Sequence, residues 1–109
     1  MEQAGTHTVC RPVGELDAAT VAQFREELAP YSGHARLVID LSEVPFMDSA
    51  GLGGLIGSIR RAREHDGEVA VVCGRVGISR LLHTTGLDRI VAVADSVEEA
   101  LDALGPPMR

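Results

Sequence analysis

Residues 36–64 read RLVIDLSEVPFMDSAGLGGLIGSIRRARE and contain a predicted strand, a connection and a predicted helix in continuous order. The strand is indicated by the uninterrupted apolar run Leu37-Val38-Ile39, which is typical of a strand covered on both faces in a parallel sheet. The helix is indicated over 49–64 by apolar residues at positions i, i+3, i+4 and i+7. These residues are Leu52, Leu55, Ile56 and Ile59. The stretch therefore predicts one β-α unit of an α/β protein.

Strands and helices continue to alternate on either side of this unit. The other strands are predicted over 6–13, 69–73 and 90–93. The other helices are predicted from Ala18 to Pro30, around Ile78, Leu81 and Leu82, and over 97–104. The resulting order, β-α-β-α-β-α-β-α, predicts a mostly parallel sheet with right-handed crossover connections.

A few residues with strong backbone preferences define the ends of these elements. Asp17 suits the N-cap of the first helix. Pro12 cannot donate to a sheet ladder, so the first strand is expected to end near it or to lie at an edge. Gly86 fits the C′ position of the third helix, and Ser96 with Glu99 forms a capping box before the fourth.

Composition and charge exclude several classes of function. The chain has 109 residues, which is one domain by length. Aromatic residues make up only 3% of the chain, so few side chains are available to stack on nucleic-acid bases. The net charge is −6, which repels phosphate backbones. We therefore expect no direct nucleic-acid partner. No run of about 18 apolar residues and no signal peptide is present, which predicts a soluble, cytoplasmic protein without membrane insertion.

The chain has two cysteines, Cys10 and Cys73, which are too few for a disulfide framework or a zinc site. Both fall in predicted strands, where a buried, small apolar side chain is the favoured interpretation. No metal site and no cofactor is predicted.

The predicted helix over 49–64 carries four glycines within its first nine residues: Gly51, Gly53, Gly54 and Gly57. Each costs about 1 kcal/mol relative to alanine inside a helix, so a packing or functional reason is expected, such as the close approach of another backbone. We expect the glycines to serve docking more than folding, so that alanine at Gly53 or Gly54 keeps or raises the stability.

Ser49 stands at the start of this helix and has three interpretations. The first is an N-cap, a role that either Asp48 or Ser49 could fill and that spacing alone favours. The second is a hydrolase nucleophile, but that motif needs glycine two residues earlier, where Met47 stands, and no base is evident. The third is a phosphate acceptor, because a helix N-terminus stabilises negative charge.

Two further patterns are weaker. The run Gly51-Leu52-Gly53 would need glycine at position 56 for a dinucleotide fingerprint, and Ile56 stands there. The chain has no lysine for a P-loop. The basic residues Arg60, Arg61 and Arg63 form a patch that is more often a solvated helix face than a site.

At the level of family, the segment Phe46-Met47-Asp48-Ser49-Ala50-Gly51-Leu52-Gly53 resembles the signature of bacterial anti-sigma factor antagonists, within the STAS domain superfamily. The segment Gly14-Glu15-Leu16-Asp17 resembles the second landmark of that family. The strand over 37–41 and the segment 87–93 fit as well. The resemblance covers the chain from about residue 6 to residue 104.

The resemblance implies a single STAS-like domain over 1–109, with a mixed, mostly parallel sheet of four or five strands and about four helices. It implies that Ser49 is the phosphorylated serine, that Asp48 positions the hydroxyl or the partner, and that Asp17 lies on the docking surface. Gly51 and Leu52 would provide a small apolar contact. The implied partner-binding residues are Glu15, Asp17, Asp48, Ser49, Ala50, Gly51 and Leu52.

The implied partners are an anti-sigma factor, which is a GHKL-type serine kinase, and a PPM-type serine phosphatase. The unphosphorylated protein would bind the anti-sigma factor and release the sigma factor, and phosphorylation would end that binding. No catalytic residue is implied, so the protein is expected not to be an enzyme. Two departures concern the sheet edge: only residues 1–5 precede the first strand, which predicts a short hairpin, and Pro12 replaces an aliphatic residue.

Two alternatives remain open at this point. The chain could be a STAS-type interaction module of a transporter or of a stress-signalling complex. It could also be an enzyme that uses Ser49 as its nucleophile, which the missing base disfavours.

Overall fold

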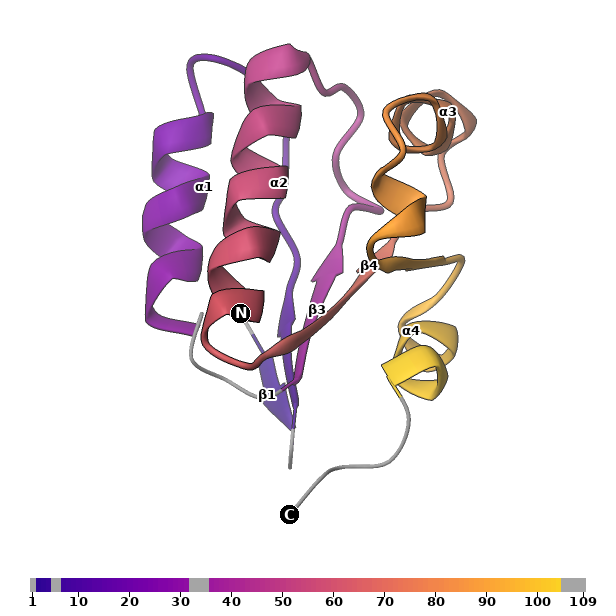
Figure 1. The fold of residues 1–109 in the computed structure, drawn as a ribbon. Coiled ribbons are helices and arrows are strands. Elements are labelled where there is room, and N and C mark those ends of the chain that lie inside the picture. Colours follow the sequence, from indigo (N-terminus) through magenta and orange to yellow (C-terminus); the bar gives the residue numbers. More distant parts are fainter. Residues whose placement is uncertain (1, 5–6, 32–35, 105–109) are drawn as a thin grey trace.

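The computed structural model describes residues 2–4, 7–31 and 36–104. Its strands are β1 (Glu2–Ala4), β2 (His7–Cys10), β3 (Arg36–Asp40), β4 (Glu68–Val72) and β5 (Ala92–Ala94). Its α-helices are α1 (Val21–Leu28), α2 (Ser49–Glu64), α3 (Val76–Thr84) and α4 (Val97–Leu104), and short 3₁₀ turns cover Ala29–Tyr31 and Leu87–Arg89 (Figure 1).

The five strands form one sheet in the order β1-β2-β3-β4-β5. Strands β2 to β5 pair in parallel, while β1 pairs antiparallel with β2 through partners such as Glu2 and Val9. The expected mixed, mostly parallel sheet with four helices is therefore confirmed. The hairpin at the N-terminus is short, as the sequence predicted, with a three-residue first strand.

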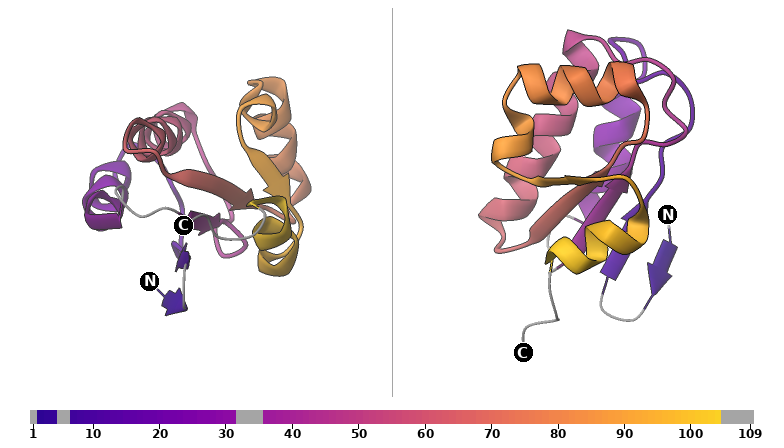
Figure 2. Two further views of the ribbon diagram at one scale, coloured as in Figure 1. Left: turned by 60° about the horizontal axis from the view of Figure 1, so that its bottom comes forward. Right: turned by 90° about the vertical axis from the view of Figure 1, so that its right-hand side faces the viewer.

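Helices cover both faces of this sheet. Helices α1 and α2 lie on one face, and α4 lies on the other (Figure 2). All five residues of β3 are buried, because Leu37 and Ile39 pack with the α1–α2 layer while Val38 packs with α4. The continuous apolar run that predicted a strand covered on both faces is explained by this position.

Several element boundaries differ from the sequence prediction: β4 lies one residue earlier than 69–73, β2 ends at Cys10 and not at residue 13, and two helix or strand starts are delayed. Helix α1 begins at Val21, not Ala18, because the Asp17 carboxylate caps a turn and accepts hydrogen bonds from the Ala19 and Thr20 amides at 2.9 and 3.1 Å. Strand β5 begins at Ala92, because the amides of Ile90 and Val91 still hydrogen-bond to the Leu87 carbonyl and keep the chain turning.

Most of the other boundaries are confirmed. Helix α2 spans Ser49–Glu64 as predicted, and β2 ends two residues before Pro12. Gly86 follows α3 with φ +83°, the left-handed conformation expected of a C′ glycine. The Ser96 hydroxyl accepts a hydrogen bond from the Glu99 amide, which is one half of the expected capping box. The predicted start of the first strand at Thr6 lies outside the described residues.

Both cysteines are buried side chains, as predicted. Burial raises the pKa of Cys10 to about 11, and burial also raises the pKa of Cys73. The two thiols are therefore protonated at neutral pH and are poor nucleophiles. Within the described ranges, no helix is long and apolar enough to cross a membrane.

Candidate functional site

Two loops at the carboxyl edge of the sheet meet and form one surface. The loop after β2 contains Gly14–Asp17, and the loop after β3 contains residues 42–48. Their backbones are joined from Gly14 N to Glu43 O (3.1 Å), from Leu16 N to Phe46 O (3.0 Å) and from Asp48 N to Leu16 O (3.3 Å). Because β2 and β3 are neighbouring parallel strands, both loops leave the sheet at the same edge. The two sequence landmarks therefore lie side by side, and we name this surface the rim.

Asp48 is the N-cap of α2. Its backbone is extended (φ −101°, ψ −174°), and Oδ1 accepts a hydrogen bond from the Gly51 amide at 2.8 Å. Its Oδ2 accepts a longer hydrogen bond from the Ala18 amide at 3.4 Å, so the same carboxylate also holds the loop before α1. Of the two residues that spacing offered as caps, Asp48 fills the role, and the Ser49 side chain is left out of it.

Ser49 is the first residue of α2, and it is exposed. In the described part of the chain, its hydroxyl takes part in no hydrogen bond. The two loops around it carry carboxylates and no histidine, so they offer no imidazole base for a nucleophilic serine. The arrangement can instead accept a phosphate beside the free amides at the helix N-terminus.

Two of the helix glycines are required by packing inside the domain. A Cβ at Gly51 would lie 2.0 Å from the Leu16 carbonyl oxygen, and a Cβ at Gly54 would lie 2.1 Å from Cγ2 of Val21. Gly53 has nothing within 4 Å of the corresponding position. The expected close approach of another backbone is therefore present within the chain itself, at Gly51. The contact with Val21 argues against the expectation that alanine at Gly54 keeps the stability, and the expectations for both Gly53 and Gly54 stay predictions.

The predicted partner-binding residues divide by exposure. Glu15 and Ser49 are exposed, while Asp17, Asp48 and Ala50 are half-buried. Gly51 and Leu52 are buried, with only 8% of Leu52 accessible. These two residues therefore offer little surface in the unbound domain, where they pack inside it, and their expected contact with a partner stays a prediction.

Two residues outside the predicted set belong to the rim. The Thr20 hydroxyl donates to the Glu15 carbonyl at 2.8 Å and accepts from the Asp17 amide at 3.0 Å, which fixes the loop that presents Glu15. Phe46, on the second rim loop, is 51% exposed, so its ring is available for contact. Phe46 is the first residue of the segment 46–53 that carries the family resemblance, and this position could have indicated its place on the rim. Nothing in the spacing around Thr20 pointed to its role.

The comparison with family models matches residues 1–100 to the STAS domain. The chain belongs to the STAS domain family. An anti-sigma-B factor antagonist from Staphylococcus aureus is 33% identical over 87 residues, which are 78% of this chain and 81% of that protein. A solved anti-sigma factor antagonist from Mycobacterium paratuberculosis is 28% identical, with a TM-score of 0.87 over 96% of this chain and 91% of the other.

The fold of this STAS domain is also found outside such regulators. The STAS domain of a SulP transporter from Vibrio cholerae aligns with a TM-score of 0.75 over 94% of this chain and 83% of the other, at 23% identity. That likeness is one of fold, so the fold by itself does not choose between the two classes.

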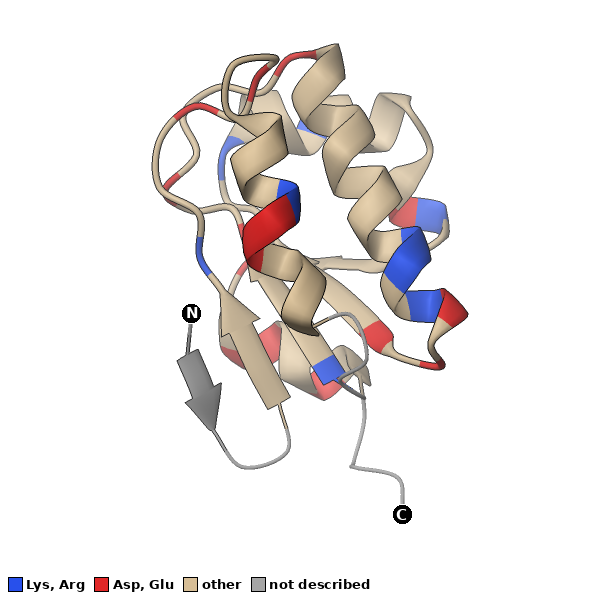
Figure 3. Ribbon diagram, turned by 90° about the vertical axis from the view of Figure 1, so that its left-hand side faces the viewer, with Lys and Arg blue, Asp and Glu red and all other residues tan. Residues whose placement is uncertain are grey.

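The rim of the STAS domain is acidic. Glu15, Asp17, Glu43 and Asp48 lie on its two loops, and neither loop contains lysine or arginine. Acidic residues mark these loops in Figure 3. Below the rim, Arg11 Nε pairs with Asp40 Oδ2 at 2.9 Å. Burial acts to raise the pKa of Asp40, but hydrogen bonds from Arg11 and Ser42 outweigh it and hold that pKa below its usual value.

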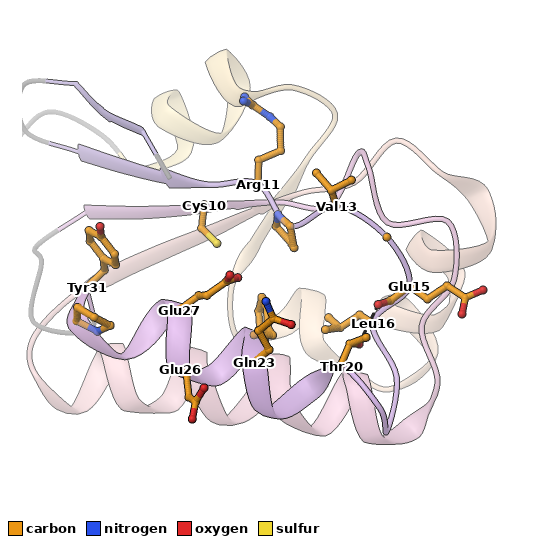
Figure 4. Close-up of a pocket in the computed structure, with 14 residues that line it drawn as sticks. Cys10, Arg11, Val13, Glu15, Leu16, Thr20, Gln23, Glu26, Glu27 and Tyr31 are labelled. Carbon is orange, nitrogen blue, oxygen red and sulfur yellow. Dashed lines mark hydrogen bonds between the residues drawn. The ribbon is translucent and has the colours of Figure 1, made fainter.

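A groove of about 610 Å³ continues from the rim, between α1 and the segment Cys10–Leu16. Figure 4 shows Gln23 and Glu27 of α1 directed toward the strand, with Cys10 facing them. Since the Cys10 thiol stays protonated, the groove has no nucleophile there. Within the described ranges, no cluster of acidic, cysteine or histidine side chains is placed to hold a metal ion.

Proposed function

We propose that this protein is an anti-sigma factor antagonist controlled by phosphorylation of Ser49. The unphosphorylated form binds an anti-sigma factor that is a GHKL-type serine kinase and thereby releases the sigma factor. The kinase transfers phosphate to Ser49, and a PPM-type serine phosphatase removes it. The observation that carries the proposal is the exposed Ser49 hydroxyl, free of any capping role, at the first position of α2 on the rim. The Staphylococcus aureus relative is named an anti-sigma-B factor antagonist, and this similarity supports the proposal.

The proposed docking surface is the rim, through Glu15, Asp17, Asp48, Ser49 and Ala50. Exposed Phe46 adds an apolar contact of the size that interfaces use as an anchor. The surrounding carboxylates favour a partner surface that carries arginine or lysine, because complementary charge steers association. Domain boundaries at 1–109, with a core over about 6–104, belong to the same proposal.

The switch follows from the cost of burying charge. A phosphoserine adds a charge of about −1.5 to −2 at pH 7. At the centre of a contact surface it must be desolvated, and an unpaired buried charge costs about 3–5 kcal/mol. Since about 1.4 kcal/mol corresponds to a factor of ten in Kd, phosphorylation is expected to weaken binding by two or more decades.

The competing function, an interaction module of a transporter, rests on the fold alone. The identity with a named antagonist and the exposed serine at the helix start favour the regulator. Since the rim loops offer no imidazole beside Ser49, the geometry gives no support to a histidine-activated hydrolase nucleophile.

The test is affinity capture of partners from the cells that make the protein, with phosphopeptide mapping of the same sample. We expect a GHKL-type kinase in the captured material and phosphate on Ser49. Ser49→Ala should bind that kinase constitutively, and Ser49→Asp should bind it at least tenfold more weakly. Ser42→Ala, an exposed serine on the same rim loop, is the matched control and should behave as the natural protein does. Phosphate on Ser42 or Ser58, or capture of a transporter alone, would overturn the proposal.

A further inference from the structure

A second groove lies between α1 and α2, away from the rim. It has a volume of about 320 Å³ and is bordered by the last turns of α1 and by residues 57–64 of α2. Along α2, Gly57 and Arg61 follow Ser49 by eight and twelve residues, which places them about 12 and 18 Å from the helix start. The groove is therefore separate from the proposed phosphorylation site.

The floor of the groove is apolar. Leu28 of α1 and Leu37 of β3 line it, and both belong to the core, with 3% and 1% exposed. Gly57 contributes no side chain, and a Cβ added there would meet nothing within 4 Å. Gly51 and Gly54 are explained by packing inside the domain, but Gly57 is not. A glycine in a helix interior costs stability relative to alanine, and here its visible effect is to leave the groove open.

Three guanidinium groups border this floor, those of Arg25, Arg60 and Arg61. In the described part of the chain, none of the three takes part in a hydrogen bond or an ion pair. Arg25 reaches across to α2, since its Nε lies 3.5 Å from the position of a Cβ on Gly54. Arg63 does not join them, because it donates to the Ile90 carbonyl.

The charge of this border is opposite to that of the whole chain. The net charge is −6, yet three arginines from two helices and a single carboxylate, that of Glu64, line one groove. Guanidinium groups carry fixed donors that match carboxylate and phosphate oxygens in pairs. An anion bound in the groove would be attracted by the positive charges that line it.

We propose that this groove binds a small amphiphilic anion. Its carboxylate or phosphate head contacts Arg25, Arg60 and Arg61, and its short apolar body lies in the space that Gly57 leaves, against Ala29 and the aliphatic stems of these arginines. The volume is at the lower end of small-molecule sites, which suits a ligand smaller than a nucleotide cofactor. The alternative, that these arginines are only a solvated helix face, does not explain why an apolar floor lies between them or why Arg25 of the other helix lines the same groove.

The test is a titration of the ¹⁵N-labelled protein with hexanoate, followed by amide NMR. Hexylammonium, with the same chain and opposite charge, and inorganic phosphate, without a chain, are the comparison probes. We expect saturable shifts confined to residues near 25–29 and 57–64, at least tenfold weaker binding of phosphate, and no site-specific shifts with hexylammonium. Residues 14–18 and 46–50 should not respond, which keeps this test independent of the function proposed for Ser49.

Two variants sharpen the result. Gly57→Leu should fill the groove and abolish hexanoate binding, while Gly53→Ala, a glycine replacement on the same helix with open space around it, should leave binding unchanged. The double variant Arg60→Gln/Arg61→Gln should bind at least tenfold more weakly, with Arg80→Gln on α3 as its control. If Gly57→Leu does not fold, the double variant decides alone. Shifts that do not saturate, equal shifts with hexylammonium, or unchanged affinity in the double variant would overturn the proposal.

Discussion

Asp48 connects the two halves of the rim with one carboxylate. Sequence alone left Asp48 and Ser49 as equal candidates for the N-cap, because both residue types accept hydrogen bonds from the first amides of a helix. The choice depends on which residue has extended backbone angles and which has already entered the helix. Asp48 is extended, and Ser49 is helical, so the hydroxyl of Ser49 stays available.

Replacing Asp48 should therefore weaken the fold and not only the binding. Asp48→Ala removes the acceptor for the Gly51 amide and for the Ala18 amide. We expect the free energy of unfolding to fall by about 0.5–2 kcal/mol, measured by urea denaturation. Asp48→Asn, which keeps an acceptor oxygen, should recover most of the loss. Glu43→Ala on the same rim is the control and should change stability by less than about 0.5 kcal/mol. An unchanged stability in Asp48→Ala would mean that the cap contributes nothing.

Adjacent glycines on α2 offer a matched pair. Gly53→Ala places a methyl group in open space and should stabilise the protein by about 0.4–1 kcal/mol. Gly54→Ala directs the same methyl group at the branched side chain of Val21, so overpacking should destabilise it by about 1–3 kcal/mol. The measurement is the melting temperature and the unfolding free energy of both variants. Equal effects at the two positions would contradict this assignment of roles.

The elements that sequence predicted best are those with long apolar periodicity. Helix α2 has sixteen residues with an apolar stripe from Leu52 to Ile59, and its bounds were predicted correctly. The errors fall on short segments where a local hydrogen bond competes with the pattern. Asp17 is a residue type that often caps helices, but here its carboxylate caps a turn before α1. The Leu87 carbonyl accepts hydrogen bonds from two following amides, so strand β5 begins later than predicted. Residue type alone does not reveal these turns, since the same residues are compatible with a turn and with the predicted helix or strand.

The ends of β2 and β3 are joined by a pH-dependent pair. The pKa of Asp40 lies below its usual value in the folded state, so its carboxylate stabilises the fold above the unfolded pKa of about 3.9. That contribution is lost as the pH falls through the folded pKa. We expect the natural protein to be more stable than Asp40→Asn at pH 7 and the difference to shrink below about pH 4. Arg11→Gln removes the partner guanidinium and should weaken the same pH dependence. Urea denaturation at a series of pH values measures both. A constant difference across that range would contradict the prediction.

At the scale of the whole molecule, the position of the candidate site was predictable from the sequence. Which of its residues are exposed and which are buried was not predictable. Both landmarks stand just after predicted strands, and the carboxyl ends of neighbouring parallel strands meet at one edge. That argument brings Glu15 and Ser49 together from sequence alone. It cannot tell that Gly51 and Leu52 face inward, because their burial depends on how closely α2 packs against Leu16. It also cannot find the groove at Gly57, which requires the relative placement of two helices.

Phosphorylation should change binding without remodelling the domain. The rim loops are held by backbone hydrogen bonds and by Asp48, and none of these bonds uses the Ser49 side chain. A phosphate at the helix N-terminus is stabilised by about 0.3–1 kcal/mol, and repulsion from Asp48 and the other rim carboxylates opposes that gain. The net effect on the free energy of unfolding should therefore be small. When a partner surface covers the phosphate dianion, the cost of removing its hydration is not offset, so binding is weakened.

The two forms can be compared by amide NMR and by calorimetric titration against the cognate kinase. We expect shifts confined to residues near 14–18 and 46–54, a melting temperature that changes little, and a Kd at least a hundredfold weaker. Ser49→Ala treated with the same kinase is the control for phosphate at any other position. Because the rim is one end of a sheet whose strands run through the core, a rearrangement of the fold would appear in β3 and β4. Widespread shifts in those strands, or an unchanged Kd, would place the switch elsewhere than at the interface.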